Sequence, residues 1–359
     1  METFGAGARA FSSRKVIMSL PVKSFLSPME ALLVQEIPEG PGWQYEPKWD
    51  GFRCLIFRDG AKTTLQSKAG QPLTRYFPEM VEAVSKLKAE KFVLDGELVI
   101  PDGARLSFNQ LLLRIHPAAS RVKKLSLEHP SVFIAFDLLV DEQSKSLLKT
   151  PLQERRKALE RFASEFFPLD KAIRLSPATT NLKTARQWFS QVGTDLDGIV
   201  AKRLKSPYLS GERTGMEKVK LARTADCVIG GFRYASKKKV VGSLLLGLYD
   251  DDGLLQHVGF CSGLKTKERK ELLATLQPLI KKPGFTGRAP GGPSRWSTAR
   301  STEWQPLAPK LVVEVTYDHF TDGRFRHGTK LIRWRPDKAP KQCRMEQVAP
   351  IGKGLMHLI

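Results

Sequence analysis

Apolar and polar positions alternate over short distances in the first two thirds of the chain. Residues 53–57 and 63–67 are rich in apolar and β-branched side chains and flank an Asp-Gly pair, which predicts a hairpin. The same criteria predict further strands over 92–100 and 132–140, and helices over 77–87 and 152–166. Strand pairs mixed with helices, without a regular βαβ repeat, favour an α+β fold over a doubly wound parallel sheet.

The pattern changes after Lys220, where short apolar runs surround one helical segment. The predicted strands and helix are 227–232, 242–249, 258–260, 265–279 (the helix) and 311–317. Many short strands around one helix suit a small Greek-key barrel such as an OB-fold. We therefore expect one domain over 18–222 and a barrel over 223–359. Residues 1–17, rich in Gly, Ala, Ser and Arg, are expected to be a disordered leader or the product of a misassigned start.

The net charge of the chain indicates what kind of partner it binds. The chain of 359 residues has 58 Lys and Arg against 37 Asp and Glu, a formal net charge of +21, which points to a polyanionic partner. It has no apolar run of 18 residues, so we expect no membrane span. The four cysteines are scattered without a C-x-x-C pair, which disfavours a zinc module or a disulfide-stapled secreted fold. A cytoplasmic, nucleoid-associated protein is the expectation.

The sharpest local signal is the segment 46–53, Glu-Pro-Lys-Trp-Asp-Gly-Phe-Arg. It places Lys48, an Asp-Gly pair and Arg53 within six residues at a junction between strands. A lysine becomes a nucleophile when burial or neighbouring cations depress its pKa, and the chain supplies such cations later, at Lys218 and Lys220. Lys48 is therefore the candidate nucleophile.

Other polar residues interrupt apolar strands in a way that suits a nucleotide site. Glu97 and Asp197 each lie beside apolar residues, and carboxylates next to a triphosphate are what Mg²⁺ or Mn²⁺ requires. Lys218 and Lys220 are spaced to share one face of a strand, where they could hold an α-phosphate. Phe136 could stack on a base.

Taken together, these segments resemble the covalent nucleotidyltransferases, the superfamily of ATP-dependent DNA ligases, RNA ligases and capping guanylyltransferases. The matching segments, in family order, are Lys-x-Asp-Gly-x-Arg at 48–53, Asp-Gly-Glu at 95–97, Phe-Asp-Leu-Leu at 136–139, Asp-Gly-Ile-Val-Ala-Lys at 197–202, Lys-x-Lys at 218–220 and Arg-Pro-Asp-Lys at 335–338. The resemblance is strongest to standalone bacterial ATP-dependent DNA ligases of the ligase C type. It implies a nucleotidyltransferase domain followed by an OB-fold barrel.

The resemblance also implies a role for each matched residue. Lys48 would form a lysyl–AMP phosphoramidate with ATP, and AMP would then pass to the 5′-phosphate of a nick. Glu97 and Asp197 would support the metal ion. The remaining nucleotide-binding positions are Glu46 for adenine, Phe136 for base stacking, Arg53 and Lys68 for ribose and phosphate, Glu97 for the ribose, Lys218 and Lys220 for the α-phosphate, and Arg335 and Lys338 for the pyrophosphate.

Three positions depart from the family pattern. Met216 replaces the Trp of the Trp-x-Lys-x-Lys motif. Asp197 replaces the usual Glu and is one methylene shorter than it. Lys68 replaces an Arg, which keeps the charge but loses the bidentate fork. We expect these to be variations within active ligases.

The expected partners follow from the same resemblance. ATP and Mg²⁺ or Mn²⁺ are the cofactors, nicked duplex DNA is the substrate, and Ku or a primase-polymerase is a partner by family analogy alone. The protein is expected to act as a monomer in DNA repair. Arg288, Arg295 and Arg300 in the Pro/Gly/Arg-rich loop 283–301 are candidate DNA contacts, and a solvated loop is the alternative.

Rival functions remain open at this point. A capping guanylyltransferase would use GTP, and an RNA ligase would seal RNA; the closing Arg-Pro-Asp-Lys segment favours a DNA ligase over both. A non-catalytic nucleic-acid-binding protein with a relict site is a further alternative, although Lys48, Glu97 and Asp197 are all present. An NAD⁺-dependent ligase is disfavoured because the four-cysteine zinc module is missing.

Overall fold

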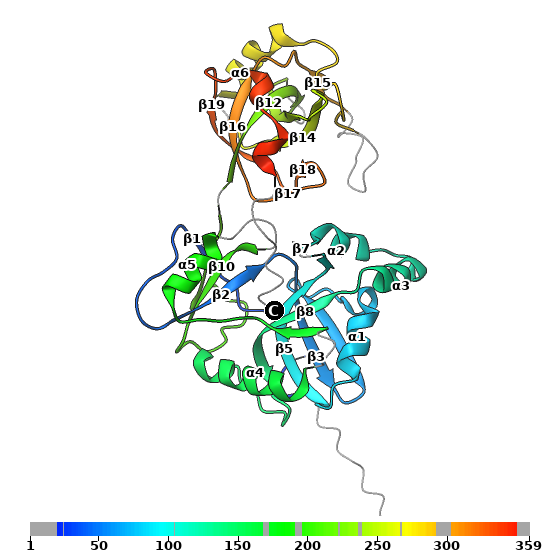
Figure 1. Ribbon diagram of the computed structural model, residues 1–359, viewed down its shortest axis with the longest axis vertical. Coiled ribbons are helices and arrows are strands. Elements are labelled where there is room, and N and C mark those ends of the chain that lie inside the picture. The colour runs from blue at the N-terminus through cyan, green and yellow to red at the C-terminus, as the bar shows by residue number, and fades with distance from the viewer. Residues whose placement is uncertain are drawn as a thin grey trace, which may run out of the picture.

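The computed structural model describes residues 20–349 except 24, 104, 168–171, 191–195, 222, 236–238, 266–267 and 292–302. Figure 1 shows two bodies, a larger one built from the first part of the chain and a smaller barrel that carries the C-terminal strands. The expected leader over 1–17 and the loop residues Arg295 and Arg300 lie outside the described residues. In the described part of the chain, no helix is long and apolar enough to cross a membrane.

The larger body contains a five-stranded sheet in the order β4-β3-β5-β8-β9. Its strands are β3 (Phe52–Asp59), β4 (Lys62–Ser67), β5 (Lys91–Val99), β8 (Val132–Val140) and β9 (Ile173–Leu175). The predicted hairpin is confirmed: β3 pairs with β4 in antiparallel register, and Gly60 in the turn has φ 59°. The predicted strand over 132–140 has the same bounds in the structure.

A second sheet of four strands, in the order β1-β11-β10-β2, packs beside the first. Its strands are β1 (Leu32–Val34), β2 (Trp43–Trp49), β10 (Leu196–Arg203) and β11 (Met216–Val219). Apolar side chains of the two sheets share core clusters; Leu55 and Val93 of the first sheet pack with Met216 of the second, and Trp49 and Leu196 pack with residues of β5 and β8. The motif residues of the sequence thus sit on two sheets held face to face by apolar contacts.

Helices cover the outer surfaces of the sheets. They are α1 (Pro78–Ser85), α2 (Phe108–Arg114), α3 (Ala119–Glu128), α4 (Leu152–Phe166) and α5 (Leu182–Ser190), with a 3-10 turn at Thr74–Tyr76. α4 has the predicted bounds and buries Leu159 and Phe162 against the five-stranded sheet. A small hairpin of β6 (Pro101–Asp102) and β7 (Arg105–Leu106), which the sequence analysis did not predict, precedes α2.

The C-terminal strands form a closed barrel. β12 (Arg223–Tyr234), β13 (Val241–Tyr249), β14 (Leu255–Cys261), β16 (Val312–Tyr317) and β19 (Lys330–Trp334) run in the order β14-β13-β12-β16-β19. A parallel bridge between Cys261 and Thr329 joins β14 to the segment that enters β19, and so closes the sheet. The helix α6 (Glu268–Leu276) lies between the third and fourth barrel strands in sequence, as in an OB-fold. The predicted α+β architecture with a C-terminal OB-fold is confirmed.

Short elements complete the barrel. They are the 3-10 turns Gln277–Leu279, Pro340–Gln342 and Met345–Val348, and the strands β15 (Gln305–Pro306), β17 (Phe320–Thr321) and β18 (Arg324–Phe325). β17 and β18 pair as a hairpin at the end of the barrel that faces the larger body (Figure 1). β14 is longer than the predicted strand 258–260, because pairing with β13 extends it over Leu255, Gln256 and His257.

Candidate active site

A cavity of about 440 Å³ opens between the two sheets of the larger body, a size typical of small-molecule sites. Strand β2, the start of β3, the end of β4, strand β5 and strands β10 and β11 all contribute to its wall. Seven of the residues singled out as nucleotide-binding or catalytic line it: Glu46, Lys48, Arg53, Lys68, Glu97, Phe136 and Lys218.

Lys48 lies near the end of β2, and its side chain is about one quarter exposed. Its Nζ is 2.6 Å from Oδ2 of Asp197 on the neighbouring strand β10. The register between these strands shifts between Leu196 and Gly198, an irregularity that leaves Asp197 beside the Lys48 amine. The predicted nucleophile and one of the predicted metal-binding carboxylates are therefore in direct contact.

The backbone requires glycine at two positions of the site, Gly198 after Asp197 and Gly51 after Asp50. Gly198 has φ 144°, and a Cβ there would lie 1.8 Å from the carbonyl oxygen of Val219 on β11. A Cβ at Gly51 would lie 2.3 Å from the carbonyl oxygen of Leu98. Only glycine permits these close approaches, which bring β10 against β11 and β3 against β5 at the site.

Asp197 is the centre of a charge cluster. Its Oδ2 also lies 2.8 Å from the Nζ of Lys220, and its Oδ1 lies 3.0 Å from Nε2 of His319. Burial alone would raise the pKa of Asp197, but the hydrogen bonds from His319, Lys48 and Lys220 hold that pKa well below its usual value. Asp197 is therefore a stable anion next to the candidate nucleophile.

The pKa of Glu97 is shifted in the opposite direction to that of Asp197. Burial raises the pKa of Glu97 to about 8, and the nearby charges of Asp50 and Asp95 act in the same direction, although Lys48 and Arg53 oppose them. A strongly shifted carboxyl group in a cavity is typical of functional sites. A cation bound beside Glu97 would favour its ionised form.

The end of the cavity predicted to bind the base is organised around Phe136. Lys202 Nζ lies 4.7 Å from the centre of the Phe136 ring and 2.7 Å from Oε2 of Glu46. The other oxygen of Glu46 accepts a 2.7 Å hydrogen bond from Nε2 of Gln44. The buried Glu46 carboxylate is thus held at a fixed position near an aromatic face, as a base-recognising group needs to be.

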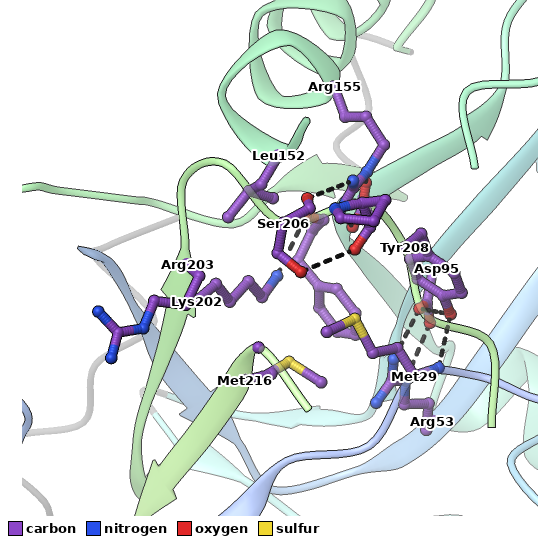
Figure 2. A pocket seen from close by; sticks show the side chains of 14 residues that line it. Met29, Arg53, Asp95, Leu152, Arg155, Lys202, Arg203, Ser206, Tyr208 and Met216 are labelled. Atoms are coloured by element: carbon purple, nitrogen blue, oxygen red, sulfur yellow. Dashed lines mark hydrogen bonds and ion pairs between the residues drawn. The ribbon is translucent and has the colours of Figure 1, made fainter. Parts of the chain in front are cut away.

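Arg53 is fixed by a buried carboxylate beneath the site. Its guanidinium makes two hydrogen bonds to Asp95, of 3.0 and 2.7 Å, and lies 5.1 Å from the centre of the Phe136 ring. The hydroxyl of Tyr208 donates a further 2.6 Å bond to Asp95 (Figure 2). Figure 2 shows Arg53, Asp95 and Tyr208 together on the right of the view, with Met216 to their left. Met216 is buried, at the position where the family has Trp.

The end of the cavity predicted to bind phosphate carries Lys68 and Lys218. Lys218 lines the cavity, and burial, Lys48, Lys68 and Lys220 lower its pKa. Lys68 is half exposed at the rim, and its Nζ lies 3.0 Å from Oε2 of Glu30. This concentration of positive charge suits a triphosphate or a nucleic-acid phosphate.

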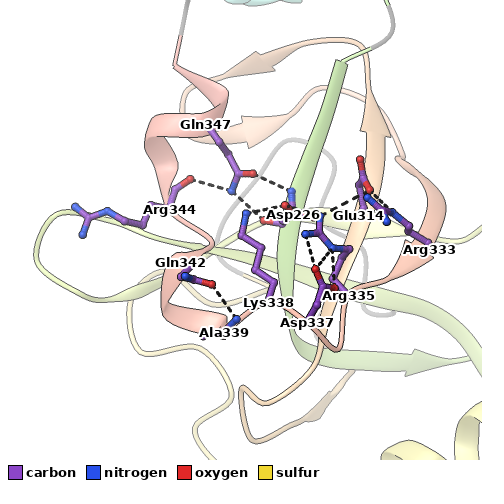
Figure 3. A network of polar contacts seen from close by, with 10 residues as sticks. All are labelled: Asp226, Glu314, Arg333, Arg335, Asp337, Lys338, Ala339, Gln342, Arg344 and Gln347. Atoms are coloured by element: carbon purple, nitrogen blue, oxygen red, sulfur yellow. Dashed lines mark hydrogen bonds and ion pairs between the residues drawn. The ribbon is translucent and has the colours of Figure 1, made fainter.

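The structure does not bring Arg335 and Lys338 into this cavity. Both lie on the barrel and bind Asp226, at 2.9 Å from Arg335 Nη1 and 2.7 Å from Lys338 Nζ (Figure 3). Arg335 also forms a two-pronged contact with Asp337. These two residues are thus engaged within the barrel, away from the other candidate residues.

A different part of the barrel reaches the site instead. Arg326 makes two 2.8 Å hydrogen bonds to the carboxylate of Asp50, two residues after Lys48. Its guanidinium also lies 4.0 Å from the centre of the Phe108 ring. Together with His319, this contact fixes the barrel against the acidic side chains that flank the nucleophile.

Of the three loop arginines proposed to contact DNA, Arg288 is described. Its side chain donates to the backbone carbonyls of Asp322 and Gly323 in the β17–β18 hairpin. Its backbone N–H donates to Gln256. Arg288 therefore supports the hairpin next to the domain contact, and its role toward DNA stays a prediction.

Sequence reasoning missed several residues of the site. Asp95 and Lys202 lie inside motifs that the sequence analysis had identified. Both are charged residues within apolar strands, and this feature could have identified them. Glu30 and His319 carried no such signal, because the contacts of Glu30 with Lys68 and of His319 with Asp197 join residues 38 and 122 positions apart.

Comparison with known proteins agrees with the geometry. Residues 25–220 match the family model of the ATP dependent DNA ligase domain, and residues 237–338 match that of the ATP dependent DNA ligase C terminal region. DNA ligase C2 of Mycolicibacterium smegmatis is 44% identical, covering 92% of this chain and 96% of the relative. DNA ligase C of Mycobacterium tuberculosis is 42% identical with the same coverage.

A solved structure agrees in fold. A solved structure from a structure-function analysis of Lig E DNA ligases has a TM-score of 0.53 and 16% identity to this chain. The match covers 86% of this chain and 99% of that one. At this identity the likeness speaks for the fold alone. The family matches and the ligase C identities confirm the resemblance seen in the motifs: this chain belongs to the family of ATP-dependent DNA ligases.

Proposed function

We propose that this ligase seals nicks in duplex DNA by three transfers, the first two of which use Lys48. The Lys48 amine attacks the α-phosphorus of ATP, a phosphorus–nitrogen bond forms and pyrophosphate leaves. An oxygen of the 5′-phosphate at the nick then attacks the same phosphorus, which breaks that bond and frees Lys48. Finally the 3′-hydroxyl attacks the 5′-phosphorus and AMP leaves. The single observation that carries this proposal is the 2.6 Å contact between Lys48 and Asp197 inside a cation-rich cavity.

The cavity supports a defined orientation of the nucleotide. Adenine would stack on Phe136 and be read by Glu46, whose position Lys202 and Gln44 fix. Arg53 would reach the ribose from its anchor on Asp95. Such positioning is the main contribution of a protein to phosphoryl transfer, together with neutralisation of charge.

The α-phosphate would meet the lysines at the other end of the cavity. Lys218 lines the wall there, and Lys220 lies within 2.8 Å of Asp197. Lys68 belongs to the same group of cations at the rim. These charges would offset the negative charge that builds up around the transferred phosphorus.

The carboxylates fit a divalent cation that is shared with the nucleotide. Among the described residues no group of three or more His, Cys, Asp or Glu side chains could hold a metal ion. Mg²⁺, however, commonly takes one or two carboxylates and completes its shell with phosphate oxygens and water. Glu97 and Asp197 would hold Mg²⁺ or Mn²⁺ in this way, and the ion would draw charge from the phosphate oxygens.

The role proposed for Arg335 and Lys338 requires the barrel to move. Both are bound to Asp226 and do not line the cavity, so they would reach the pyrophosphate only after a rotation of the barrel. We place the hinge near residues 221–224, between β11 and β12, with the nucleotidyltransferase domain over 18–222 and the OB-fold domain over 223–359. The contacts of His319 and Arg326 would then belong to the arrangement used after Lys48 is charged.

The excess of positive charge would hold the DNA. A net charge of +21 favours contacts to the phosphates of a duplex, which position the enzyme without reading sequence. Arg288, Arg295 and Arg300 belong to this proposal. The proposal also includes a monomeric enzyme in the cytoplasm at the nucleoid and a role in DNA repair. Ku or a primase-polymerase as a partner is supported by family analogy alone.

Labelling with α-³²P-ATP and Mg²⁺ tests the proposal. We expect wild-type protein to acquire label that remains after denaturation, and Lys48→Ala to acquire none. Lys62→Ala is the matched control, because Lys62 is exposed on β4 outside the cavity. Label from α-³²P-GTP, or sealing of nicked RNA in preference to nicked DNA, would support the capping or RNA-ligase alternatives, and unlabelled wild-type protein would contradict all three.

A further inference from the structure

One carboxylate at the phosphate end of the cavity has no role in the scheme above. Glu30 precedes β1 and lines the cavity beside Lys68 and Lys218. An acidic side chain is unexpected where a polyanion must bind. Building on the proposed nucleotide site, we propose that Glu30 is a positioning residue that orients Lys68 toward an incoming phosphate group.

Glu30 is itself firmly held. Its backbone N–H donates a 2.7 Å hydrogen bond to the carbonyl of Glu212, and the N–H of Met29 donates a 3.1 Å bond to the Tyr208 hydroxyl. The Glu30 side chain is only about one quarter exposed. A carboxylate with a fixed backbone and little freedom is a suitable anchor for a mobile partner.

Lys68 needs such an anchor. It lies in the turn Ser67–Gly70 after β4, and its side chain is half exposed, so its long flexible stem could take many conformations. The family has Arg here, whose planar fork presents its donors in a fixed geometry, whereas an ammonium group does not. The 3.0 Å contact with Glu30 supplies the orientation that the Arg→Lys difference removes.

The contact leaves Lys68 able to bind phosphate. An ammonium group has three donors, so Lys68 can keep Glu30 and still donate to an incoming oxygen. Arg213 Nε lies 3.2 Å from the same Glu30 oxygen and supplies a second countercharge. The hydrogen bond and charge of Lys68, with Arg213, lower the pKa of Glu30, so it stays ionised at neutral pH.

Single-turnover self-adenylation of the full chain tests the inference. We expect Glu30→Ala to raise the half-saturating ATP concentration about two- to five-fold, in line with a partly exposed ion pair. The rate at saturating ATP should change less than about two-fold. Glu30→Ala combined with Lys68→Arg should recover most of the loss, because the arginine fork needs less help. In a Lys68→Ala background, Glu30→Ala should have no further effect.

The phosphate could come from ATP or from the nick, so sealing of pre-adenylated nicked DNA forms a second arm. A shift in half-saturating ATP assigns the nucleotide phosphate to Lys68, and a shift confined to sealing assigns the 5′-phosphate. Glu39→Gln is the control, because Glu39 forms an exposed ion pair with Arg186 outside the cavity.

Three outcomes overturn the inference: no shift in either arm, a lowered half-saturating ATP concentration, or an equal shift when Lys68 is already Ala. Wild-type protein that labels normally separates these outcomes from a failure of the proposed function.

Discussion

A buried histidine in the OB-fold barrel should make this ligase sensitive to acid. His257 on β14 is 6% exposed, and neither ring nitrogen has a hydrogen-bond partner among the described residues. Burial lowers the pKa of His257 to about 3, and the positive charges of Arg324, Arg233 and Arg288 add to the effect. The ordinary value of 6.5 applies in the unfolded chain.

The sign and size of the effect follow from these two values. Because the folded-state pKa is the lower one, the unfolded chain binds the extra proton, and stability is lost as pH falls from about 6.5 toward 3. At pH 5 the unfolded His257 is almost fully protonated and the folded one almost fully neutral. The difference costs about 2 kcal/mol relative to pH 8, roughly a 30-fold change in the folding equilibrium. Any folded pKa below about 4 gives nearly the same figure.

Urea unfolding at pH 8 and pH 5 measures this pH-dependent loss of stability. His257→Leu and His257→Gln cannot titrate, so each should lose about 2 kcal/mol less stability than wild type between the two pH values. The two variants will differ in absolute stability, because they pack differently against Phe285, yet they should share the same reduced pH dependence. If the larger body and the barrel unfold in separate transitions, the transition whose midpoint changes in the variants is the unfolding of the barrel. Equal pH dependence in wild type and both variants would refute the reasoning.

Three further predictions concern the active site and the DNA contact. Asp95→Asn should lower the free energy of unfolding by about 3–5 kcal/mol in urea titrations, because it leaves the largely buried Arg53 without its charged partner. The exposed Asp251→Asn should change little. Gly198→Ala should reduce lysyl–AMP formation at least about ten-fold in the ATP-labelling assay, because the new Cβ forces β10 away from Val219; normal labelling would contradict this account. Raising salt from about 50 to 200 mM should weaken binding to nicked DNA at least about ten-fold, whereas self-adenylation should change less than about three-fold. Equal suppression of both would show that the excess positive charge is not divided between the nucleotide and the duplex.

The sequence by itself determined the elements and the chemistry of the cavity. Strand 132–140 and helix 152–166 could be placed because periods of two and of three to four residues are local properties of the chain. The motif residues could be named because six segments, in family order, resemble the covalent nucleotidyltransferases. Lys48, Glu97 and Lys218 accordingly line one cavity.

Only the tertiary structure decided how these groups act on one another. The shifted register at Asp197, the Glu30 contact with Lys68 and the His319 contact with Asp197 depend on how two sheets and a barrel pack, and no local pattern encodes that packing. The sequence likewise assigned Arg335 to ATP, whereas in the structure it binds Asp226. A side chain on a domain joined by a short connection can serve two surfaces, and which one it serves is set by the contacts between the domains rather than by its position in the sequence.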